Sequence, residues 1–68
     1  MPTYEFVIHN KHVRECLSKG NHHKTFSDNW GESHYIEFIA PSEASALSKC
    51  QLKYPDNEGF VIEGVSQV

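Results

Sequence analysis

The chain has 68 residues, of which 38% are hydrophobic and 22% are charged, and its formal net charge at pH 7 is −3. A chain this short has apolar surface for one core only, so we expect a single small domain over residues 1–68. No apolar run approaches the roughly 18 residues of a membrane-spanning helix, and the N-terminus lacks the pattern of a signal peptide. We therefore expect a cytoplasmic protein in which Cys16 and Cys50 are reduced thiols.

The charge is distributed unevenly. Residues 11–24 hold four basic residues and one acidic residue, a local formal charge of +3, whereas the rest of the chain carries −6. Four of the five histidines lie in or beside this basic segment. Any site that needs cations or imidazoles is therefore expected in residues 9–24.

Residues 3–9, "TYEFVIH", alternate between two kinds of side chain. Tyr4, Phe6 and Ile8 fall on one side of an extended chain, which predicts a strand with one buried face. Residues 34–40, "HYIEFIA", repeat the arrangement with Ile36 and Phe38 on the buried side. Both segments are therefore predicted to belong to a sheet.

Between these strands, "HVRECLS" is predicted to be a further strand with Val13 and Leu17 on one face. "KGN" would form a turn, after which "HHKTFS" would return antiparallel. A long loop over residues 10–33 is the alternative. The hairpin is favoured because more than about 20 structureless residues are unusual in a compact domain.

The segment "PSEASALSKCQLKYP" predicts a helix. Ser42 is a good N-cap, Glu43 complements the helix dipole in the first turn, and Pro55 limits the helix at its end. The predicted apolar stripe contains Leu47, Cys50 and Tyr54, with Ala44 and Ala46 at its margins.

After the turn "PDNEG", the residues "FVIEGVSQV" predict a last strand, in which Gly64 marks a bulge or a close backbone approach. If this strand runs parallel to residues 34–40, the two form a right-handed βαβ unit, and the first strand fits between them. We therefore predict an α+β fold with a three- to four-stranded sheet and a single helix packed on one face. The order would be ββαβ or ββββαβ, in the ferredoxin-like, split-βαβ style.

The run "YIEFIAPSEASALSKCQLKYPDNEGFVIEGVSQV", which is half of the chain, carries a strand, a Ser-x-x-x-Ala helix, Tyr-Pro and a strand. In this it resembles many small accessory proteins encoded by bacteriophages and mobile elements. The resemblance implies an architecture and a phage-encoded accessory role. It carries over no functional residue.

Metal binding is the first chemistry to consider. His12, Cys16, His22 and His23 are zinc-ligand types, and a hairpin could bring three or four of them together. Their spacing matches no standard zinc finger or ribbon, and adjacent histidines on an extended chain point apart. We therefore expect no metal or cofactor, with zinc as the alternative.

Nucleic-acid binding is the second. Lys11, Arg14, Lys19 and Lys24 could contact phosphates, while Phe26, Trp30 and Tyr35 could stack on bases. The acidic remainder of the chain and a pI near 5.9 oppose this, so we do not expect nucleic acid as the partner. A metal- or nucleic-acid-binding module in residues 9–24 remains the alternative function.

Catalysis is the third. Cys16 with a histidine, or His22 and His23 with Asp28, would supply a nucleophile or an acid and a base. No motif supports either set, and so small a domain has little room for a substrate pocket. We expect no enzyme and no catalytic residues.

Protein binding is the function that the sequence favours. A sheet covered by one helix leaves its other face free, and on that face we predict Val7, Ile39, Val61 and Val65 with Tyr35. The alternative is that residues 24–32 fold over this face. We expect a non-enzymatic protein that binds another protein or itself, as a homodimer. The predicted binding residues are Arg14, Lys24, Phe26, Trp30 and Tyr35.

Overall fold

The computed structural model describes all residues from 1 to 68. Its elements in chain order are β1 (Thr3–Asn10), α1 (Lys11–Ser18), the 3-10 helix η1 (Asp28–Gly31), β2 (His34–Ile39), α2 (Glu43–Lys53), the 3-10 helix η2 (Asp56–Glu58) and β3 (Phe60–Gln67). The sheet order is β2-β1-β3, and both outer strands run antiparallel to β1. The α+β class and the placement of the first strand between the other two are therefore confirmed.

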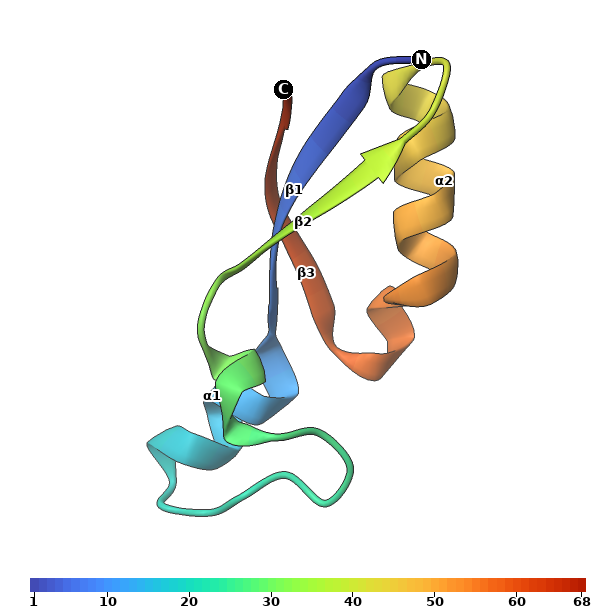
Figure 1. Cartoon of the computed structure of the whole chain (residues 1–68). Coiled ribbons are helices and arrows are strands. Elements are labelled where there is room, and N and C mark those ends of the chain that lie inside the picture. Colours follow the sequence, from blue (N-terminus) through green and yellow to red (C-terminus); the bar gives the residue numbers. More distant parts are fainter.

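The molecule is elongated, with extents of 42 × 19 × 14 Å. Helix α2 lies along one face of the sheet, and both chain ends lie at one end of the molecule (Figure 1). Residues 11–33, which we call the α1 end, occupy the opposite end and contain α1 and η1. Neither helix is long and apolar enough to cross a membrane.

The core lies between β1 and α2. Phe6 and Ile8 are fully buried on the face of the sheet that α2 covers. Ala46 and Cys50, one helical turn apart, are the fully buried residues of α2, and their small side chains allow the helix to lie close to the sheet. Leu47, which is predicted to lie on the buried stripe of this helix, is 37% exposed, and the neighbouring Ala46 is buried in its place.

The predicted hairpin over residues 12–27 is wrong, because residues 11–18 form α1 and no fourth strand exists. Asn10, the last residue of β1, caps this helix: its Oδ1 accepts from the backbone N–H groups of His12 (3.0 Å) and Val13 (3.1 Å). Val13 is fully buried, and Leu17 lies one helical turn further on. The asparagine cap favours a helix, with which this spacing is compatible, so the domain has two helices and three strands.

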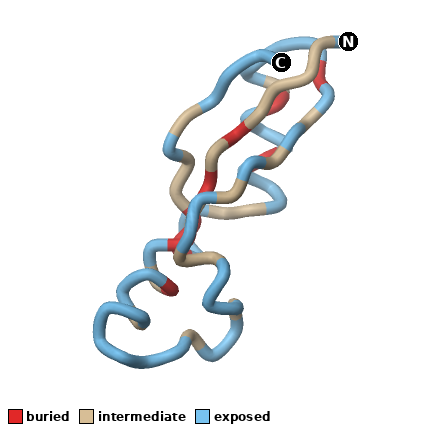
Figure 2. The backbone as a smooth tube through the Cα atoms, turned by 60° about the vertical axis from the view of Figure 1, so that its left-hand side comes forward, coloured by how far each residue is buried: buried red, intermediate tan, exposed pale blue.

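The same asparagine joins the α1 end to the rest of the domain. Asn10 Nδ2 donates to the carbonyl of Glu58 (3.1 Å), and the backbone N–H of Lys11 donates to the carbonyl of Gly59 (2.7 Å). Gly59 has a φ of 97°, and a Cβ at this position would lie 2.6 Å from His12 Nδ1. We call these five residues, Asn10, Lys11, His12, Glu58 and Gly59, the junction. Figure 2 shows buried residues running through the sheet and the junction, while most of the α1 end is exposed.

Candidate protein-binding surface

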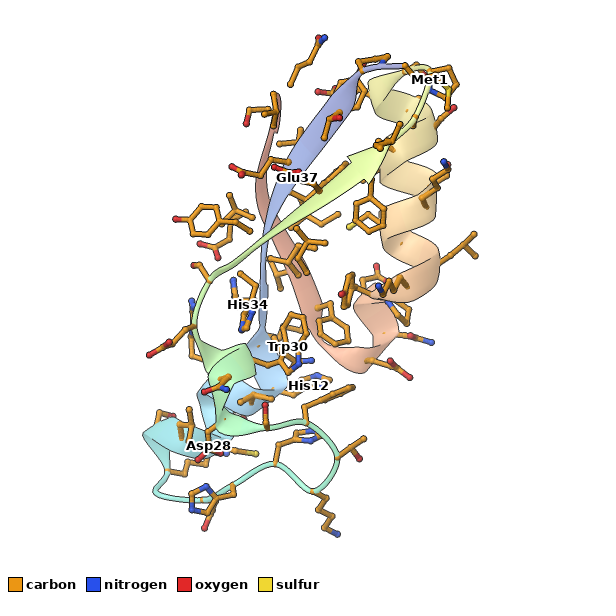
Figure 3. All side chains as sticks on the ribbon, viewed as in Figure 1. Met1, His12, Asp28, Trp30, His34 and Glu37 are labelled. Carbon is orange, nitrogen blue, oxygen red and sulfur yellow. The ribbon has the colours of Figure 1, made fainter.

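Two of the three aromatic residues predicted to bind a partner, Phe26 and Trp30, pack against the core. The rings of Phe26 and Trp30 have their centroids 5.0 and 5.1 Å from that of the buried Phe60, and Trp30 also contacts Tyr54 at 5.3 Å. Figure 3 shows Trp30 beside the start of β3, near His34, on which its ring stacks at 4.3 Å. Phe26 and Trp30 are both half-buried, so part of each side chain contributes to the packing of the core.

The remaining predicted binding residues lie apart from one another. Arg14 Nε donates to the carbonyl of Gly31 (2.9 Å), which ties α1 to η1. Lys24 is exposed in the loop after α1, whereas Tyr35 is 68% exposed on β2. The five predicted residues thus do not form one surface, and only Tyr35 lies on a free face of the sheet.

The histidines of the α1 end do not converge on a common point. His22 Nδ1 lies 2.8 Å from Asp28 Oδ2, and His23 Nδ1 accepts from the backbone N–H groups of Thr25 and Phe26. His12 and His23 do line one shallow hollow of about 350 Å³ together with Cys16. However, the two imidazole rings stand parallel with centroids 6.5 Å apart, and no three His, Cys, Asp or Glu residues are placed to hold a metal ion.

The two cysteine thiols differ in how far they are buried. Cys16 is half-buried on α1, whereas Cys50 is fully buried in the core. Burial raises the pKa of the Cys50 thiol, because the thiolate would lose its hydration. Cys50 is therefore a packing residue.

The sheet face turned away from α2 carries no covering segment. We call it the open face, and the strand register assigns its residues: Thr3, Glu5, Val7, His9, Tyr35, Glu37, Ile39, Val61, Gly64 and Ser66. Glu63 has no register partner and is placed on the same face by its contact with His9. The alternative that residues 24–32 fold over this face is wrong, because Phe26 and Trp30 pack against Phe60 on the α2 side. The open face is thus available in the monomer.

One predicted member of this face lies on the other side. Val65 pairs with the buried Phe6 and so faces the same side as α2. The register shifts between Val7 and Ile8, which pair with Gly64 and Ile62 respectively. This bulge, predicted from Gly64, reverses the faces of the residues that follow it.

The open face is organised in rows across the strands. Glu37, Glu5 and Ser66 are register partners, and we call them the acidic row. On one side of it lies the tyrosine row of Tyr35, Val7 and Gly64, and on the other the isoleucine row of Ile39 and Thr3. Successive rows are about 6.7 Å apart, since they are separated by two residues of extended chain. Two apolar rows therefore flank an acidic one.

The electrostatic character of this face is uniformly acidic. The three strands contain no Lys or Arg, and all three of their acidic residues, Glu5, Glu37 and Glu63, lie on the open face. Glu5 and Glu37 stand directly opposite each other, an arrangement of like charges that destabilises a strand pair. Glu37 lies on the side of β2 away from α2 (Figure 3).

Glu63, at the bulge, is held by its neighbours. Ser33 Oγ donates to its Oε2 (2.6 Å), and His9 Nδ1 lies 3.0 Å from the same oxygen without hydrogen-bond geometry. The hydrogen bond from Ser33, followed by the contact with His9, lowers the pKa of the Glu63 carboxyl below its usual range. Glu63 therefore has a structural role that Glu5 and Glu37 lack.

One edge of the sheet is partly closed. Lys49 of α2 reaches over the end of the edge strand β2, and its Nζ donates to the carbonyl of Ile39 (2.8 Å). A lysine at such a position hinders another strand from pairing with the edge. The open face, more than this edge, is the surface that the fold leaves for a partner.

Comparison of the chain with protein-family models, with curated protein sequences and with solved structures gave no match.

Proposed function

We propose that the chain is a non-enzymatic protein-binding module whose open face binds one segment of another protein. The observation that carries this proposal is the exposure of two large apolar side chains beside an unpartnered acidic pair. Tyr35 is 68% exposed and Ile39 is 58% exposed, and they flank Glu37 on the same face of β2. A partner that covers them removes apolar surface from water and supplies counter-charge to the glutamates.

The size of the face limits the partner. Three strands lie about 4.8 Å apart, with six register pairs between β1 and β2 and seven between β1 and β3. At about 3.3 Å for each pair, this gives a surface of about 10 by 20 Å before side chains spread. This is far below the roughly 800 Å² that each partner buries in a standard interface. The open face therefore suits a single secondary-structure element, and the complex is expected to be of the transient kind.

A second copy of the chain is the alternative occupant, and the charges of the face disfavour it. A two-fold dimer through the open face would place one acidic row close to the other, without a lysine or arginine from either sheet. The basic segment of a second copy would match the charge. Such a contact pairs two different surfaces, so copies would form a ring or an open-ended chain according to the rotation between them, unless a two-fold axis lets both copies make it at once.

The setting that we propose follows from the resemblance of residues 35–68 to accessory proteins of bacteriophages and mobile elements. Such a protein would act in the cytoplasm of its host cell. A small module that covers one segment of another protein fits an accessory role, because it alters its partner without doing chemistry of its own.

Site-specific photo-crosslinking in the cells that produce the protein tests the proposed function. A photoreactive phenylalanine analogue replaces Tyr35, and the matched control carries it in place of Ser48, which is exposed on α2. We expect a discrete crosslinked protein from position 35 and none from position 48. Equal crosslinking at both positions, or none at position 35, would contradict the proposal.

Self-association is measured separately by sedimentation of the purified chain. Monomers at high concentration would be consistent with a foreign partner. A closed dimer that Tyr35→Ser dissociates would assign the open face to a second copy, contrary to the charge argument above.

A further inference from the structure

We infer that the segment bound by the open face is an amphipathic α-helix that carries a Lys or Arg between two apolar residues. This inference rests on the proposed function and specifies its partner. Three properties of the open face support it: its backbone, the spacing of its rows and its charge.

The backbone of the face excludes an extended partner. The N–H and C=O groups of a sheet lie in its plane, so the open face offers side chains alone. An extended segment laid on it would bury backbone groups without hydrogen-bond partners. A helix satisfies its backbone internally, and α2 already covers the opposite face in this manner (Figure 1).

The spacing of the rows matches a helix that lies along the strands. Successive rows are about 6.7 Å apart, whereas residues i and i+4 of a helix are about 6 Å apart along its axis. A helix can therefore place one side chain on the tyrosine row and the residue four positions on over the acidic row. The residue eight positions on, about 12 Å from the first, lies near the isoleucine row, which is about 13 Å from the tyrosine row.

The charge determines the middle residue. Glu5 and Glu37 are direct register partners, and no strand of the sheet contains a Lys or Arg. A Lys or Arg over this pair is attracted by both carboxylates, whereas Glu or Asp is repelled. The partner pattern is thus apolar, basic, apolar at positions i, i+4 and i+8.

Three synthetic peptides of about four helical turns test this pattern. The first has Leu, Lys and Leu at the three positions on an alanine and glutamine background, the second replaces the Lys with Glu, and the third places a Pro in the middle of the first sequence. Binding to the full chain is measured by fluorescence anisotropy at low ionic strength, and its location by amide chemical shifts. We expect the Lys peptide to bind about tenfold more tightly than the Glu peptide.

Two protein variants assign that difference to the acidic row. In the double variant Glu5→Gln/Glu37→Gln, the tenfold preference for the Lys peptide over the Glu peptide should fall below about twofold. A tenfold difference in Kd is what one favourable charge contact supplies, and this variant removes that contact. Glu32→Gln, which removes an exposed acid outside the sheet, should leave it unchanged. Because both changes remove surface charge and no packing, the folds should persist, which circular dichroism verifies.

The inference is overturned if the Lys peptide does not bind, if the Pro peptide binds as tightly, if the Glu peptide binds equally, or if the shifts map to the α1 end. Crosslinking at position 35 distinguishes the two proposals. If position 35 still crosslinks to a protein but no peptide binds, the protein-binding function is retained and the helical partner is rejected. If position 35 gives no crosslink and no peptide binds, both proposals are rejected.

Discussion

Replacing Asn10 by Ala tests whether one side chain connects the two ends of the molecule. Asn10 is fully buried, and its amide makes three hydrogen bonds: two as the cap of α1 and one to the carbonyl of Glu58. Alanine makes none of them. The change therefore removes the helix cap and the side-chain contact with η2 at the same time.

The expected loss follows from these contacts. Loss of an N-cap asparagine costs about 1 kcal/mol. The bond to the Val13 N–H is buried, and each buried group left without a partner costs about 1–3 kcal/mol. We therefore expect Asn10→Ala to lower the free energy of unfolding by about 2–4 kcal/mol. A domain of this length has only about 3–10 kcal/mol in total, so the effect is large.

Urea unfolding, followed by the fluorescence of Trp30, measures this loss. Asn10→Ser provides a graded control, since its hydroxyl can still accept from α1 but is too short to reach Glu58, and it should cost about 1 kcal/mol less than alanine. Asn29→Ala, at an exposed position in η1, should change stability by less than about 0.5 kcal/mol. A loss below about 0.5 kcal/mol for Asn10→Ala would refute the reasoning.

Four further predictions follow from the packing and the charges. Gly59→Ala should lower the free energy of unfolding by about 2–4 kcal/mol, because it combines a positive φ with a clash between the new Cβ and the His12 ring. An unchanged melting temperature would show that the residues of the junction shift to accommodate the methyl group. Trp30→Ala should cost about 3 kcal/mol as part of the aromatic packing, and a loss below about 1 kcal/mol would indicate a free binding residue instead. Ellman's reagent should modify Cys16 in the folded protein and Cys50 only after unfolding, and a Cys16→Ser variant that still reacts rapidly would contradict this. The pKa of Glu63 is lower in the folded protein than in the unfolded chain, so its ionised carboxylate stabilises the fold above about pH 4.3, and this stabilisation is lost as the pH falls through the folded pKa. Glu63→Gln should therefore lose less unfolding free energy on acidification than the original protein, and identical pH dependence of stability in the two proteins would contradict this.

The strands could be predicted because alternation is a local signal. The period of two in residues 3–9 and 34–40 requires one buried face, and the structure buries Phe6 and Ile8 as that signal indicates. The sequence pattern does not distinguish α1 from a strand, because Val13 and Leu17, four residues apart, share a face in either. Asn10 was the signal that distinguishes the two, since asparagine is a preferred N-cap.

The surface was predictable only in part, for a physical reason. Alternation places Val7, Tyr35 and Ile39 on one face, as the register shows. Alternation alone places Val65 on the wrong side, because one extra residue in a strand reverses every later side chain. The acidic row is invisible along the chain, because Glu5 and Glu37 come together only when the strands pair.

The sheet order also fixes when the fold can be completed during synthesis. The central strand β1 is synthesised early, but Thr3 cannot pair until Ile39 has been made, and Tyr4 cannot pair with Gln67 until the end of β3 has been made. Local contacts in α1 and α2 can form on the growing chain, whereas one edge of β1 has no strand to pair with until β3 has been made. A chain with such distant pairings folds slowly for its size and is open to aggregation in the meantime. A ribosome that stalls before residue 60 would therefore release a product whose middle strand has one neighbour and one bare edge.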